Sequence, residues 1–79
     1  MKMIVKYFGA AADVTGRKEE TISIETGQTL KEFKVKLEQQ YNGLKNINYS
    51  IALNQSVVSE DVTVNDKDEI AILPPFAGG

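Results

Sequence analysis

Hydrophobic and polar residues alternate over residues 2–8, a pattern typical of a β-strand because successive side chains of a strand point to opposite faces. One face would carry Met3, Val5 and Tyr7, and the other Lys2, Ile4, Lys6 and Phe8. We expect the second face to point outward because it holds two lysines. A second alternation over residues 20–25 predicts a half-buried strand with Ile22 and Ile24 inward.

A helix is predicted to begin after Thr29. Thr29 and Glu32 match a capping box, in which a hydroxyl and a carboxylate satisfy otherwise unpaired N–H groups. One apolar stripe recurs at steps of three and four, through Leu30, Phe33, Leu37 and Tyr41. Asn42-Gly43 would end this helix, with the glycine in the left-handed conformation.

The second half of the chain predicts three more strands, at residues 50–53, 57–58 and 69–73. Pro74-Pro75 ends the last one because proline cannot donate to a sheet ladder. The order strand, strand, helix, strand, short strand, strand predicts an α+β fold, with a mixed sheet and one main helix packed on one face. This is the plan of a ubiquitin-like β-grasp, in which the first and last strands lie parallel at the centre. We expect a domain at residues 1–73 and an extended tail at residues 74–79.

Composition excludes several classes of function. The chain has 79 residues, 9 Lys and Arg against 11 Asp and Glu, and a net charge of −2. The absence of Cys and His excludes disulfides, thiolate nucleophiles, imidazole bases and the usual zinc sites. The acidic balance argues against binding to nucleic acid, and no apolar run is long enough to span a membrane. We therefore expect a cytoplasmic domain with no bound metal or cofactor.

Few side chains outside the tail could carry chemistry. Asp66, Asp68 and Glu69 form an acidic cluster, but their spacing does not match a calcium loop, and a solvated turn is the simpler interpretation. Gly9 and Gly16 bracket a connection, with one helical turn expected at residues 10–13, and lack the Lys and Ser or Thr of a phosphate-binding loop. The chain is therefore not expected to be an enzyme by itself.

The tail Pro74-Pro75-Phe76-Ala77-Gly78-Gly79 has the composition of a stiff probe. Paired prolines favour extended polyproline II geometry, so six residues reach on the order of 20 Å. Terminal glycines have no side chain, so the end can enter a narrow channel. The chemical group at the tip is the α-carboxylate of Gly79. The alternative is a frayed end without function, which would need neither the prolines nor Phe76.

Several motifs carry a family resemblance: Tyr7-Phe8, Gly16, Ala52-Leu53-Asn54-Gln55 with Val57-Val58, Asp68-Glu69-Ile70-Ala71, and the ending Pro-Pro-x-x-Gly-Gly. Together they resemble the small subunits of molybdopterin synthase, a family of ubiquitin-like sulfur carriers, over nearly the whole length. Relatives often carry Arg-Glu where this chain has Ala12-Asp13, which affects any partner contact expected in that loop.

The resemblance implies a function for the tail. An adenylating enzyme of the ubiquitin-activating type would adenylate the Gly79 carboxylate with ATP, and a sulfur donor protein would then replace AMP to leave a thiocarboxylate. The large catalytic subunit of molybdopterin synthase would accept the tail and use this sulfur to build the dithiolene of molybdopterin. The resemblance also implies a heterotetramer with two copies of each synthase subunit.

A docking surface is expected beside the tail. If the first and last strands are neighbours, their outward residues Ile4, Phe8, Ala71 and Leu73 would form one apolar patch for a partner. A covering loop or inverted faces would remove it. Two other functions stay open. One is a carrier for thiamine synthesis or tRNA thiolation, or a conjugated protein modifier; the other is an interaction module without C-terminal chemistry.

Overall fold

A computed structural model describes residues 1–75 of the chain. The strands and the main helix follow the predicted order, and a short 3₁₀-helix is added after the main helix. In chain order the elements are β1 (Lys2–Tyr7), α1 (Ala10–Thr15), β2 (Glu19–Ser23), α2 (Leu30–Gln40), η1 (Asn42–Asn46), β3 (Ser50–Leu53), β4 (Ser56–Val57) and β5 (Glu69–Leu73). No helix in this part of the chain has both the length and the apolar character needed to cross a membrane.

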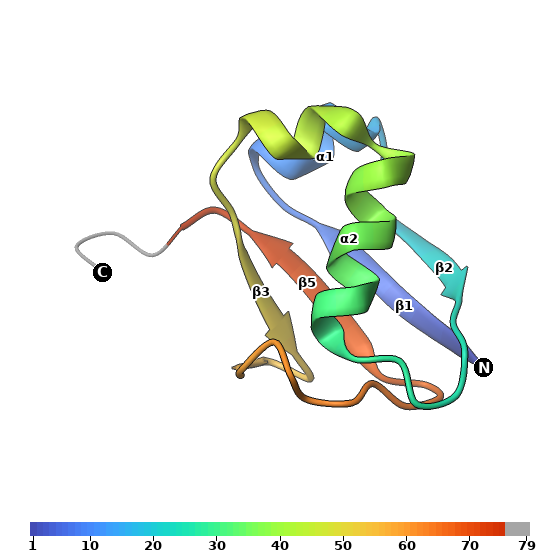
Figure 1. Ribbon diagram of the computed structural model, residues 1–79. Coiled ribbons are helices and arrows are strands. Elements are labelled where there is room, and N and C mark those ends of the chain that lie inside the picture. The colour runs from blue at the N-terminus through green and yellow to red at the C-terminus, as the bar shows by residue number, and fades with distance from the viewer. Residues whose placement is uncertain (76–79) are drawn as a thin grey trace.

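The five strands form one mixed sheet in the order β2-β1-β5-β3-β4. β1 and β5 lie parallel at its centre, with Val5 opposite Ile70, and the other neighbouring strands are antiparallel. Figure 1 shows α2 crossing one face of the sheet, while the end of β5 leads away from the body on the side opposite β2. The predicted α+β fold of the ubiquitin-like β-grasp type is therefore confirmed.

The core lies between α2 and the sheet. Its central members are at most 2% exposed: Met3, Val5, Tyr7, Leu30, Phe33, Leu37, Ile70 and Ile72. Two further fully buried residues, Leu44 and Val64, join this core from segments where the sequence predicted no element. Because these residues of β1 and β5 face inward, the alternate residues of both strands face outward, as predicted.

The capping box at the start of α2 is confirmed. The Glu32 N–H donates to Thr29 Oγ1 at 3.2 Å, and the Thr29 N–H donates to the Glu32 carboxylate at 2.9 Å. The bonds from Thr29 lower the pKa of the Glu32 carboxyl. Both contacts satisfy groups that the first helical turn leaves without a partner.

The predicted conformation of Gly43 is wrong. Gly43 lies within η1 and does not adopt a positive φ, and the residue that caps α2 is Tyr41, with φ −126°. A Cβ built on Gly43 would lie 2.9 Å from Cγ1 of Val14 in α1. The glycine therefore allows η1 to approach α1 closely, a packing requirement that no local pattern reveals.

Candidate functional site

The tail leaves the sheet between the ends of β1 and β3. Leu73, the last residue of β5, lies opposite Ser50, and the Phe8 N–H donates to the Ile72 carbonyl oxygen at 3.0 Å. Pro74-Pro75 follows directly and is exposed. The other residues predicted for the tail, Phe76, Ala77, Gly78 and Gly79, lie outside the described residues.

Gly9 packs beside the first proline of the tail. Its φ of +56° and ψ of −132° lie in a region that is essentially restricted to glycine. A Cβ built on Gly9 would lie 3.0 Å from Cγ of Pro74, so the missing side chain leaves the space that the proline ring occupies. A hollow of about 440 Å³ opens beside Gly9, with Lys6, Lys18 and Ala12 among its lining residues. Glu19 lines the same hollow, so its border has mixed charge.

Apolar residues cover the outer face of the sheet next to the tail. Phe8 is 45% exposed, and Leu73 and Ala71 are partly exposed. Cross-strand partners share a face, and Ala71 lies opposite Ala52, which lies opposite Val57. Val57 is 60% exposed, and its orientation could not be predicted because a two-residue strand shows no alternation. We name these five residues the tail-side patch, in which Ala52 is only 5% exposed and joins Ala71 to Val57.

Ile4 is exposed on the same outer face but lies apart from the tail-side patch. Lys6 stands between Ile4 in β1 and Phe8, which follows β1. Its ammonium pairs with the carboxylate of Glu69, opposite Ile4, at 3.0 Å. The hydrogen bond and charge of Glu69 raise the pKa of Lys6. The ion pair thus divides the expected patch, whereas Phe8, Ala71 and Leu73 adjoin as expected. That Phe8, Ala71 and Leu73 bind a partner stays a prediction, and the separation of Ile4 from them makes it the residue to compare with Phe8.

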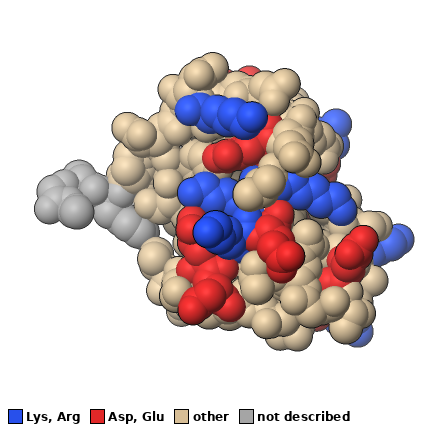
Figure 2. All heavy atoms as spheres, viewed as in Figure 1, with Lys and Arg blue, Asp and Glu red and all other residues tan. Residues whose placement is uncertain are grey.

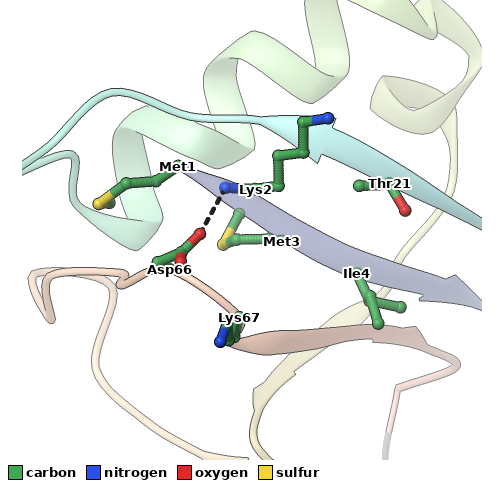
Figure 3. A pocket seen from close by; sticks show the side chains of 7 residues that line it. All are labelled: Met1, Lys2, Met3, Ile4, Thr21, Asp66 and Lys67. Carbon is green, nitrogen blue, oxygen red and sulfur yellow. Dashed lines mark hydrogen bonds between the residues drawn. The ribbon is translucent and has the colours of Figure 1, made fainter.

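Ile4 lines a separate hollow of about 680 Å³ at the end of β1 that is far from the tail (Figure 3). Its other lining residues are Met1, Lys2, Met3, Thr21, Asp66 and Lys67. The Asp66 carboxylate accepts a hydrogen bond from the Lys2 N–H at 2.9 Å, and that of Asp68 accepts one from the Asn65 N–H at 2.7 Å. These acidic residues therefore close a turn, and residues 1–75 contain no cluster of His, Cys, Asp or Glu arranged to hold a metal.

A polar cluster lies on the inner face of the sheet, at the end of β1 that precedes Phe8 of the tail-side patch. The hydroxyl groups of Tyr7 and Tyr41 donate to the Glu20 carboxylate at 2.5 Å and 2.7 Å. The two rings meet edge to face, with centroids 6.1 Å apart. Burial and the hydrogen bond to Glu20 raise the pKa of both tyrosines. The strand pattern predicted Ile22 and Ile24 inward, but it carried no signal of the partners of Glu20.

The face covered by α2 has a different character. Figure 2 shows Lys and Arg side chains interspersed with Asp and Glu over this side of the molecule. Lys34 pairs with Glu60 at 3.0 Å, and its ammonium lies 5.5 Å from the ring centroid of Tyr49. Mixed charges of this kind keep a surface hydrated, so the tail-side patch is the better candidate for burial against a partner.

Comparison with known proteins identifies a family for this chain. The ThiS family matches residues 5–79. The molybdopterin synthase sulfur carrier subunit of Mycobacterium tuberculosis is 32% identical over an alignment of 84 residues, which covers 100% of this chain and 99% of that protein.

Solved structures extend the comparison to the fold. A Pyrococcus furiosus protein solved as a candidate molybdopterin converting factor, subunit 1, has a TM-score of 0.89 at 24% identity, over 96% of this chain and 99% of that one. The complex of subunits 1 and 2 of molybdopterin-converting factor from Helicobacter pylori contains a chain that is 29% identical, with a TM-score of 0.69 and 100% of both chains covered. With its β-grasp sheet and a match that runs through the tail, this chain belongs to the ThiS family.

Proposed function

We propose that this chain is the sulfur-carrier subunit of molybdopterin synthase and that the Gly79 carboxylate carries the sulfur. Whole-length similarity to proteins named molybdopterin synthase sulfur carrier subunit supports this proposal. The observation that carries it is the end of β5, where Leu73 leads into an exposed Pro74-Pro75 beside the tail-side patch. This arrangement places Pro74-Pro75, where the tail begins, on the same side of the domain as the proposed docking surface.

Activation of the tail requires chemistry from other proteins, since a carboxylate is a poor electrophile. An adenylating enzyme of the ubiquitin-activating type would join Gly79 to the α-phosphate of ATP, with release of pyrophosphate. A sulfur donor protein would supply a sulfide equivalent that attacks the acyl carbon, expels AMP and leaves a thiocarboxylate. This chain is then the donor, ATP is consumed by the adenylating enzyme, and the reactions take place in the cytoplasm.

The large synthase subunit would bind the tail-side patch and accept the tail in its active site. Paired prolines favour an extended chain, which would lower the conformational entropy lost when the tail enters a channel. The Helicobacter pylori complex of subunits 1 and 2 supports association with a second subunit. We extend this to a heterotetramer with two copies of each subunit, and to use of the same tail by the adenylating enzyme.

Intact mass spectrometry tests the proposal directly. The full chain is incubated with the adenylating enzyme, ATP and a sulfur source, and we expect one oxygen-to-sulfur exchange that maps to Gly79. A chain extended by one residue after Gly79 is the control, and it should not be charged because its carboxylate lies too far along the channel. No exchange in the natural chain, or normal charging of the extended chain, contradicts the proposal.

The acceptor then separates the remaining functions. The charged chain, the large synthase subunit and the pterin precursor should together yield molybdopterin. Failure with a competent thiocarboxylate would favour a carrier for thiamine synthesis or tRNA thiolation, and a branched conjugate to a lysine amine would indicate a protein modifier. Full function after deletion of Gly78-Gly79 would indicate an interaction module.

A further inference from the structure

β2 is an edge strand of the sheet formed by residues 1–75, because it pairs with β1 alone (Figure 1). The Tyr7 N–H donates to the Lys18 carbonyl oxygen at 2.8 Å. The Ile24 N–H donates to the Met1 carbonyl oxygen, also at 2.8 Å. Because hydrogen bonding alternates in direction along a strand, even-numbered residues here turn their backbone groups toward β1. The residues whose N–H and C=O groups point away from the sheet are Glu19, Thr21 and Ser23.

We propose that a second copy of this chain pairs with β2 in antiparallel orientation, so that two sheets join across a two-fold axis. The register is centred on Thr21. Thr21 then lies opposite Thr21 of the other copy, and Glu19 lies opposite Ser23 of the other copy. This register uses the whole five-residue strand and pairs all of its outward backbone groups. Edge strands with such groups are templates for pairing with another chain.

Charge complementarity favours a second copy over another strand. Lys2 lies opposite Ser23, and Figure 3 shows its side chain extending from β1 in the direction of β2. None of the three ion pairs within residues 1–75 includes Lys2 or Glu19, although Glu19 lies opposite Lys6, whose ammonium pairs with Glu69. In the proposed register Glu19 of the second copy lies beyond Ser23, two strand spacings or about 10 Å from Lys2. The two long side chains meet across the small serine, and the two-fold axis repeats the pair.

The outer faces of the two copies also match. Ile4 lies opposite Thr21, and both residues line the hollow in Figure 3. Pairing places Ile4 and Thr21 of both copies in one row across the joined sheet. The tail-side patch lies over the other four strands, so the dimer leaves the patch and Pro74-Pro75 accessible. A contact through one five-residue strand is small, so the association is weak and reversible.

Analytical ultracentrifugation of the full chain over a concentration series tests the dimer. The average mass should rise from the 8.7 kDa of one chain toward twice that value by about 1 mM, a range in which weak associations are populated. A mass that stays at one chain at this concentration overturns the proposal.

Charge-reversal variants identify the surface. Lys2→Glu and Glu19→Lys each place like charges together at both symmetric positions, so each should raise the dimer dissociation constant about tenfold. The double variant should restore the natural value. Within one chain Lys2 lies opposite Ser23 and Glu19 opposite Lys6, so restoration requires a second copy.

Lys36→Glu is the matched control for Lys2→Glu, because Lys36 is exposed on α2 and its reversal changes the net charge by the same amount. This variant should keep the natural dissociation constant. A dimer that is insensitive to both edge variants, that weakens equally in the control, or that is not restored in the double variant overturns the proposed register.

Discussion

Replacing Phe8 with alanine tests the tail-side patch as the docking surface for the large synthase subunit. Phe8 is 45% exposed in the free chain, so nearly half of its surface is available for burial by a partner. For a phenylalanine of about 200 Å², docking would bury on the order of 90 Å². At roughly 25 cal/mol per Å², this burial contributes about 2 kcal/mol. Its loss should raise the dissociation constant of the complex about 30-fold.

Isothermal titration calorimetry with the purified large subunit measures this effect. Ile4→Ala is the matched control, because Ile4 is similarly exposed, at 42%, but lies beyond the ion pair of Lys6 and Glu69. This control should change the dissociation constant by less than about threefold. Thermal unfolding establishes that both variants are folded. Natural affinity in Phe8→Ala, or an equal loss in Ile4→Ala, would refute the assignment of the patch.

Two further predictions concern stability. Asn54 and Gln55 have φ of +50° and +71°, as in a type I′ hairpin turn, which favours Asn-Gly. Gln55→Gly should therefore stabilise the fold by about 1 kcal/mol, and an unchanged or lower urea midpoint would contradict this reasoning. Burial and a carboxylate raise the pKa of Tyr7 and Tyr41, so the folded chain retains protons that the unfolded chain loses above about pH 10. Below that pH, ionisation of these groups should not change the free energy of unfolding, and above it the free energy of unfolding should fall with pH. The fall should be shallower in Tyr7→Phe. Equal slopes in the two proteins would show that the cluster is not responsible.

The elements of the fold were predictable where the signal is local. The alternation in β1 and the capping box of α2 each depend on residues within a few positions of one another, and both are confirmed. The second strand was predicted at residues 20–25 and lies at Glu19–Ser23. Ile24 is still buried, at 6% exposure, so the inward face was predicted correctly although the boundary was not.

The candidate site was predictable only in part. Phe8 and Leu73 face outward as their strand patterns predicted. The two prolines at positions 74 and 75 indicated that the chain is extended where it leaves the sheet. The predicted apolar patch did not include Val57, because the place of Val57 depends on its pairing with Ala52 across a turn. Tertiary contacts therefore enlarged the predicted surface at one edge.

The order of strands and helix and the face that each central strand buries follow from the amino-acid sequence by itself. These features depend on side chains that are neighbours in the chain, so their patterns are visible without a structure. Only the tertiary structure decided that an ion pair separates Ile4 from Phe8, and that Gly43 is needed for its contact with Val14. Such contacts join segments that are distant in the chain, and their geometry arises only when the sheet and helices pack together.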